Sequence, residues 1–181
     1  MELNNIPFNQ LLQLSEADGY QYIYAIKFGK FLNKAVDHLA IGDLRQRTFG
    51  EVKDWQSMHE GGLVLRDYPV ALSIFFDKPL PELYALGVVE VCQTVAYLCE
   101  QIKDICAVER EALVRKPTIK EVKAGLERFN RYGSWPQLYS IATTFGKSIQ
   151  EVRRWGYNEC FVILCYQKDY SEYQTDFLKV K

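Results

Sequence analysis

Two histidines and five cysteines are the side chains of this sequence best suited to acid–base, nucleophilic or metal chemistry. His38 and His59 each stand without a Ser, Cys or carboxylate partner at the spacing of a known catalytic motif. We therefore expect both to be solvated or capping residues. The sequence contains no phosphate-binding glycine loop, nucleophile elbow or paired-histidine zinc motif, and Gly61-Gly62 is interpreted as a turn. This pattern predicts a protein that is not an enzyme.

The cysteines are spaced for packing rather than for chelation. Cys92, Cys99 and Cys106 lie seven residues apart, which places them on one stripe of a helix. A zinc site needs close pairs of ligands, and neither this spacing nor Cys160 with Cys165 supplies one. We predict no metal and no cofactor, and reduced thiols that line a buried seam as small hydrophobic side chains. The predicted seam consists of Val88, Cys92, Val95, Cys99, Ile102 and Cys106.

Residues 141–155 (IATTFGKSIQEVRRW) resemble a helix-turn-helix. Ala142 would let two helices approach closely, Gly146 would permit the turn, and Val152 would anchor the second helix. The side chains that would face DNA are Lys147, Ser148, Gln150, Arg153 and Arg154. The chain as a whole has a net charge of −1 and a pI near 6.2, whereas DNA affinity depends on phosphate neutralisation. We therefore expect a packed helix pair and no nucleic-acid partner, and keep a DNA-binding regulator as the alternative function.

Helical periodicity extends through most of the chain and predicts an all-α fold. Pro7 is suited to the first turn of a short helix, and a longer N-terminal helix is expected between Gly19 and Gly42. Tyr20, Tyr22 and Tyr24 alternate as they would in a strand, which leaves a strand as the alternative for that short segment. The tail from residue 166 keeps aromatic residues at helical spacing, as in a final helical turn or an aromatic arm.

Residues 48–98 and 118–165 echo one another. Thr48 and Thr118 are each followed by Glu at the third position, the spacing of a helix-capping box. The matching pairs that follow are Tyr68-Pro69 with Trp135-Pro136, Ser73-Ile74 with Ser140-Ile141, Gly87 with Gly156, and Glu90 with Glu159. The echo predicts two related three-helix units plus N-terminal helices. The alternative is that helical stretches share cap and turn residues by chance.

These features divide the chain into three consecutive ranges. Residues 1–45 would form the N-terminal helices, 46–116 the first helical unit and 117–181 the second, and the three could pack as one domain. The first residues lack the basic and apolar regions of a signal peptide, and the longest apolar stretch, 83–98, is too short and too interrupted to cross a bilayer. We expect a cytoplasmic protein that does not enter a membrane.

The aromatic content favours binding over catalysis. The chain has twelve Tyr, ten Phe and three Trp, and aromatic side chains bury a large area at low rotamer cost. Basic residues (22) nearly cancel acidic residues (23), so a general electrostatic attraction to nucleic acid or anionic lipid is not expected. The expected partner is a protein, or a second copy of the chain in a homo-oligomer.

Small helical modules, a glycine-centred turn before the helix of Ser148-Ile-Gln-Glu-Val, and the aromatic-rich segment 157–164 (YNECFVIL) resemble tail assembly chaperones and related small structural proteins of tailed bacteriophages. The resemblance covers about residues 48–165 and assigns no role to individual residues. It implies a non-enzymatic protein in the host cytoplasm that shields or organises phage tail or virion proteins during assembly. The first 45 residues and the duplication depart from that pattern, which leaves open a component that stays in the virion.

Overall fold

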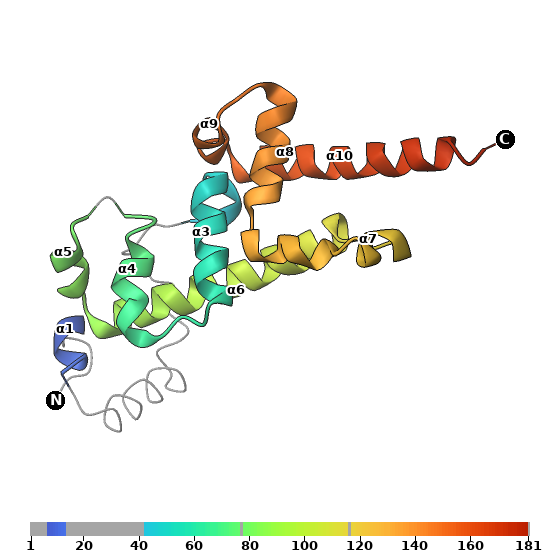
Figure 1. The fold of residues 1–181 in the computed structure, drawn as a ribbon. Coiled ribbons are helices and arrows are strands. Elements are labelled where there is room, and N and C mark those ends of the chain that lie inside the picture. The colour runs from blue at the N-terminus through green and yellow to red at the C-terminus, as the bar shows by residue number, and fades with distance from the viewer. Residues whose placement is uncertain (1–6, 14–41, 77, 116, 181) are drawn as a thin grey trace. The chain divides into compact units, whose positions relative to one another are not determined.

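The protein is mostly helical, which confirms the predicted all-α class. The computed structural model describes residues 7–13, 42–76, 78–115 and 117–180 (Figure 1). In these ranges the β-type pairing consists of two isolated antiparallel bridges, and no strand is formed. His38, the longer N-terminal helix and the alternating tyrosines of the sequence analysis lie outside the described residues. No helix in the ranges described is long and apolar enough to span a bilayer.

Short helices alternate with two long ones along the described chain. The elements are α1 (Phe8–Leu11), η3 (Leu44–Gln46), α3 (Phe49–Glu60), η4 (Leu65–Asp67), α4 (Tyr68–Leu72), α5 (Leu80–Tyr84), α6 (Val88–Leu113), α7 (Ile119–Lys123), η5 (Leu126–Tyr132), α8 (Trp135–Phe145), α9 (Ile149–Arg153) and α10 (Tyr157–Phe177).

The chain divides into two compact units, each made from two separate stretches. The first unit comprises residues 1–42 and 58–101, and the second comprises residues 43–57 and 102–181. These units differ from the consecutive ranges that the sequence predicts. Helical periodicity relates residues that are close in the chain, and it does not indicate which distant segments pack together. Helices α3 and α6 each contribute residues to both units.

The first unit is organised around Phe8, at the start of α1. Pro7 forms an antiparallel bridge with Gly87, and the Phe8 N–H donates to the Leu86 carbonyl at 2.8 Å. The Phe8 ring is fully buried and lies beside Tyr68 of α4 and Tyr84 of α5, with ring centroids 6.4 and 6.5 Å away. The buried apolar side chains around it are Leu11, Ala71, Leu72, Leu83, Val88, Val91, Val95 and Leu98.

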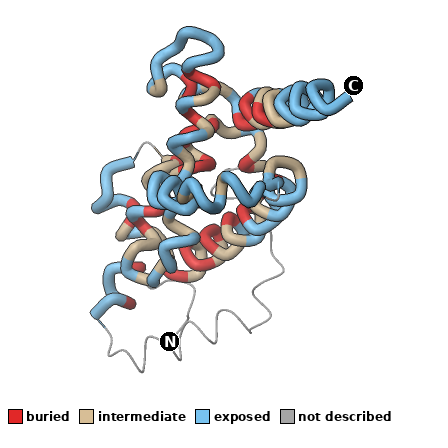
Figure 2. The backbone as a smooth tube through the Cα atoms, turned by 45° about the vertical axis from the view of Figure 1, so that its right-hand side comes forward, coloured by how far each residue is buried: buried red, intermediate tan, exposed pale blue. Residues whose placement is uncertain are grey.

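The second unit repeats this arrangement around Phe49, at the start of α3. Thr48 forms an antiparallel bridge with Gly156, and the Phe49 N–H donates to the Trp155 carbonyl at 2.8 Å. The Phe49 ring is fully buried and stacks on Tyr157 at the start of α10, 6.2 Å between centroids. Other buried apolar side chains of this unit include Val52, Trp55, Leu138, Ile141, Val152 and Cys160, and buried residues are coloured red in Figure 2.

The predicted internal echo is present in the order of the elements. Both capping boxes form: the Thr48 and Thr118 hydroxyls each accept the N–H of the Glu three residues later, at 3.3 Å. Helices α4 and α8 begin at the two aromatic-Pro pairs, and the five-residue helices α5 and α9 precede α6 and α10. The predicted third helix of each copy is divided at Gly87 and Gly156, and Gly156 has the extended backbone angles φ −62° and ψ 140°.

The tertiary contacts, however, align the copies differently from the sequence. By sequence, Thr48 corresponds to Thr118. By backbone pairing, Thr48 corresponds to Pro7, because each precedes a buried Phe and forms a bridge with the glycine that precedes a long helix. Residues 48–57 accordingly belong to the second compact unit and 58–98 to the first. Helix α7, which Thr118 caps, has no buried residue.

The predicted seam on α6 is buried at four of its six positions. Val88, Cys92, Val95 and Ile102 are buried, whereas Cys99 and Cys106 are half-exposed at its margin. The buried stripe instead continues through Leu98, Ile105 and Glu109. A straight α-helix has 3.6 residues per turn, and seven residues are therefore slightly less than two turns. Side chains repeated every seven residues move gradually away from the buried face along a long helix.

Candidate functional site

The second unit contains a buried polar cluster centred on the Glu109 carboxylate. The Lys53 ammonium lies 2.7 and 2.8 Å from the two carboxylate oxygens of Glu109. Gln56 donates to Oε2 of the same carboxylate at 2.9 Å, and the Tyr157 hydroxyl donates to Oε1 at 2.8 Å. The Lys53 and Glu109 side chains are only 3% and 11% exposed. The cluster therefore connects α3, α6 and α10 inside the unit.

The geometry of this cluster is that of a structural ion pair. Burial, with the adjacent Glu109 carboxylate second, raises the pKa of Tyr157 well above its usual range, so the hydroxyl stays a donor. Both Glu109 oxygens accept hydrogen bonds from the protein itself, which leaves the carboxylate committed to Lys53, Gln56 and Tyr157. The sequence does not indicate this cluster, because Lys53 and Glu109 are 56 positions apart and each has the spacing of an ordinary charged residue on a helix surface.

The part of the chain that the structure describes contains no group of three or more His, Cys, Asp and Glu side chains that could hold a metal ion. His59 lies in the last turn of α3, half-exposed. Burial, and then the neighbouring Glu159 carboxylate, raises the pKa of Cys160 to about 11, so its thiol stays protonated at neutral pH.

The five side chains of the helix-turn-helix hypothesis lie around the junction of α8 and α9. Gly146 ends α8 in the left-handed conformation, with φ 61° and ψ 34°, as a turn glycine should. Ser148 caps α9 by accepting the Glu151 N–H at 3.2 Å, and Lys147 pairs with Glu151 at 3.5 Å. Two of the proposed DNA-facing groups are thus engaged at the start of the helix itself.

The remaining three side chains of that hypothesis point to different surroundings. Arg153 forms an ion pair with Asp54 of α3, 2.6 Å between nitrogen and oxygen, whereas Gln150 and Arg154 are exposed. Helix α9 has five residues, hence a length of only about 7.5 Å at 1.5 Å per residue, and packs on α8. Such a helix offers little more than one turn to a DNA groove.

A stripe of exposed aromatic side chains extends along α10. The residues Val162, Tyr166, Tyr170, Tyr173 and Phe177 follow one another at intervals of four, four, three and four, which aligns them on one face of the helix. We call these five residues the α10 stripe. Tyr166, Tyr173 and Phe177 are 66%, 62% and 64% exposed. Rings pair within the stripe, Tyr166 with Tyr170 at 5.9 Å and Tyr173 with Phe177 at 6.0 Å.

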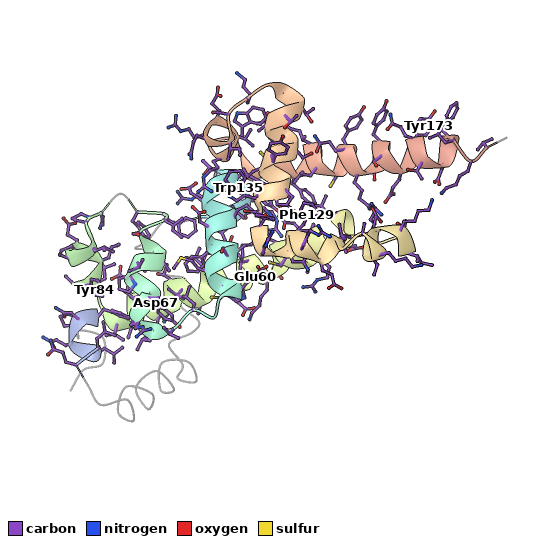
Figure 3. All side chains as sticks on the ribbon, in the orientation of Figure 1. Glu60, Asp67, Tyr84, Phe129, Trp135 and Tyr173 are labelled. Carbon is purple, nitrogen blue, oxygen red and sulfur yellow. The ribbon has the colours of Figure 1, made fainter. Side chains whose placement is uncertain are left out.

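The C-terminal half of α10 makes no buried contact in its unit. Every residue from Asp169 to Val180 is exposed, and the end of the helix is uniformly pale blue in Figure 2. Figure 3 shows Tyr173 on this exposed portion. Helical segments of this length are marginal in water without tertiary packing. An exposed aromatic face on such a segment is typical of a surface that a partner covers.

A second exposed apolar row lies on α7 and η5. Ile119 and Val122 are three residues apart on α7, and Leu126, Phe129 and Tyr132 recur every third residue along η5. A 3₁₀-helix has three residues per turn, so those three side chains share one face. We call these five residues the α7–η5 row. Neither element has a buried residue.

Exposed aromatic residues also continue into α8. Trp135, at its start, and Tyr139, one turn later, are both exposed, and Figure 3 marks Trp135 with Phe129 of η5. Sequence analysis expected an aromatic tail at helical spacing, and α10 confirms the helix. The exposed row on η5 is not evident from the sequence, because a 3₁₀-helix has a period of three residues and the α-helical pattern has a period of 3.6.

No protein-family model matches the chain, and neither a curated protein nor a solved structure is detectably similar to it.

Proposed function

We propose that this protein is a non-enzymatic binding protein that acts in the assembly of a larger protein structure. One observation supports this above all: the second unit exposes the α10 stripe, four of whose five residues follow Leu164, the last buried residue of the helix. Contiguous exposed apolar surface on a folded chain marks a binding site, because its hydration is costly and is relieved by a partner. Tyr and Phe are also well suited to anchor such an interface.

The sequence resemblance to tail assembly chaperones and small structural proteins of tailed bacteriophages indicates the kind of partner. On that basis we propose phage tail or virion proteins, met in the host cytoplasm during assembly. The chain would then either leave its partner after assembly or stay in the virion. The exposed aromatic surface supports either role equally, because both require a protein–protein interface.

A DNA-binding regulator remains the alternative, because α8, the Gly146 turn and α9 follow one another in the order of a helix-turn-helix. The shortness of α9 and the engagement of Arg153 by Asp54 favour the packed helix pair over a DNA reader. The alternative predicts a salt-sensitive DNA complex that the double variant Gln150→Ala, Arg154→Ala abolishes, since these two exposed side chains would have to contact DNA.

Co-purification after co-expression with the proteins encoded beside it tests the proposed function. The double variant Tyr166→Ser, Tyr173→Ser should lose the partner while its circular dichroism spectrum stays unchanged. Tyr97→Ser is the matched control, because Tyr97 is also an exposed tyrosine on a long helix but lies on α6 of the first unit. Retention of every partner by the double variant, with a competitor-resistant DNA complex in a gel shift, would replace our proposal with the regulator.

A further inference from the structure

The α10 stripe is bordered by acidic side chains on one edge. Asp169 is three residues after Tyr166 and four before Tyr173, and Asp176 is three after Tyr173, so both carboxylates adjoin the stripe. Two lysines lie close by. Lys168 donates to the Ala112 carbonyl at 2.9 Å and pairs with Glu172 at 3.8 Å. Lys179, just after the helix, pairs with Asp176 at 2.8 Å and offsets part of this negative charge, which leaves Asp169 as the main carboxylate of the border. The stripe is thus an aromatic surface with a negative border.

The α7–η5 row has the opposite charge pattern. Residues 115–132 contain six Lys and Arg side chains and two Glu side chains. Lys120 and Lys123 each follow an apolar residue of the row directly in sequence, and Arg128 and Arg131 each precede one. Lys120, Lys123 and Arg131 are exposed, and the Arg131 guanidinium lies over the Tyr132 ring at 4.9 Å. The row is therefore an aromatic and aliphatic surface with a positive border.

We propose that the α10 stripe of one copy binds the α7–η5 row of a second copy, so that the chain associates head to tail. This inference rests on the proposed function, because it names the partner of the same exposed aromatic surface. Both surfaces are apolar at the centre and charged at the edge, with opposite signs. Association would bury the two apolar rows together and bring Asp169 and Asp176 near the Lys and Arg border.

The charge pattern distinguishes this contact from a contact between two identical surfaces. Two α10 stripes face to face would place acidic borders together, and two α7–η5 rows would place basic borders together, each with like-charge repulsion. Both surfaces are exposed in the second unit, so no described residue of that unit covers either of them. One stripe–row contact between two copies is heterologous and generates a closed ring or an open filament, whereas two reciprocal stripe–row contacts form a two-fold dimer.

Charge reversal tests the contact in the full-length chain. One variant, Asp169→Lys with Asp176→Lys, makes both borders basic; the other, Lys120→Glu with Lys123→Glu, cancels the net positive charge of residues 115–132 and places two carboxylates at the border of the row. Sedimentation velocity over a concentration series should show self-association of the unmodified protein and at least tenfold weaker association of each variant alone. An equimolar mixture of the two variants should associate again, because each then meets the opposite border on the other.

The variant with all four substitutions gives an independent readout. Its stripe has a basic border and its row has two new carboxylates, so it should self-associate more strongly than either double variant alone. Tyr97→Ser serves as the control and should associate normally. Association that ignores both reversals, or a four-fold variant that folds by circular dichroism yet stays monomeric, overturns the inference. A chain that is monomeric throughout but loses a different protein partner when Tyr166 and Tyr173 are replaced overturns the inference and leaves the proposed function standing.

Discussion

At the scale of single residues, the second unit is held by one carboxylate with three donors. Glu109 accepts hydrogen bonds from Lys53, Gln56 and Tyr157, each from within the protein. A buried ion pair adds little over well-packed apolar residues of similar volume, but the loss of one partner leaves an uncompensated charge. The contribution of Lys53 is therefore visible mainly when it is removed alone.

We expect Lys53→Met to lower the free energy of unfolding by about 3 kcal/mol, the cost typical of breaking a buried pair. Chemical denaturation followed by circular dichroism measures it. The control is Lys53→Met combined with Glu109→Gln, which removes the orphaned charge and should recover about 1 kcal/mol or more of the loss. Equal losses in the single and combined variants would show that the charge pair is not what stabilises this region.

A second residue-scale effect concerns the capping carboxylate of α7. The hydrogen bond from Arg115, with those from Thr118, lowers the pKa of Glu121 from its ordinary value of 4.5 to about 2. A lowered pKa in the folded state means that the interaction is fully present above pH 4.5 and is lost as the pH falls towards 2. The cap of α7 should therefore persist in mildly acidic solution.

Replacement of Arg115 by Gln should raise the Glu121 pKa, because the charged donor to the carboxylate is lost while the Thr118 bonds remain. Carboxyl chemical shifts in an NMR pH titration measure the change. Glu151 is the internal reference: it has the same capping box, formed with Ser148, and should titrate identically in both proteins. An unchanged Glu121 midpoint would mean that Arg115 does not contact the carboxylate in solution.

At the scale of elements, the start of α3 is pressed against the end of α9. Gly50 lies one residue into α3, and a Cβ atom built on it would lie 2.9 Å from the Arg153 carbonyl oxygen. Backbone atoms do not move aside as a flexible side chain would. Gly156 forms the bridge to Thr48 nearby, yet a Cβ there meets nothing within 4 Å and its φ of −62° suits any residue.

Gly50→Ala should therefore destabilise the protein although alanine favours helices. The overpacking cost of about 1–3 kcal/mol exceeds the propensity gain of about 1 kcal/mol, so we expect a net loss on the order of 1 kcal/mol. Thermal unfolding by differential scanning calorimetry provides the measurement. Gly156→Ala is the matched control and should change the unfolding temperature little. A stabilised Gly50→Ala protein would contradict the close approach of α3 and α9.

At the scale of the whole molecule, two units are built on one plan and differ in what they expose. In each unit, a buried Phe begins a helix and the preceding residue pairs with the glycine before a long helix. The second unit adds α7, η5 and the exposed half of α10. No described residue between 114 and 135, or after Leu164, is buried. The arrangement that the two units share contains their buried residues, whereas α7, η5 and the end of α10 expose their side chains.

Deletion of residues 171–181 should leave folding intact and impair binding. Every described residue of this segment is exposed, so the free energy of unfolding should change by no more than about 0.5 kcal/mol, as for surface substitutions. Chemical denaturation tests the stability, and sedimentation velocity with co-purification tests the association. A deletion that unfolds the protein would show that the end of α10 packs against its own chain.

Local sequence determined the helices and where they begin. The Thr118 and Ser148 caps, the Pro starts of α4 and α8 and the Gly146 turn are set by residues within a few positions, so the sequence predicts them well. The aromatic tail was predicted for the same reason, because its helical spacing is local. The resemblance to a helix-turn-helix is local in the same way, because it depends on the spacing of Ala142, Gly146 and Val152.

The tertiary structure decided which segments pair and which aromatic side chains stay exposed. Phe49 and Phe129 are the same kind of residue, but Phe49 is buried beside the Thr48–Gly156 bridge and Phe129 is exposed on η5. Lys53 and Arg153 look like surface charges until α6 brings Glu109 to the first and α3 brings Asp54 to the second. Burial and ion pairing depend on contacts between residues far apart in the chain, and the periodicity of neighbouring residues does not indicate those contacts.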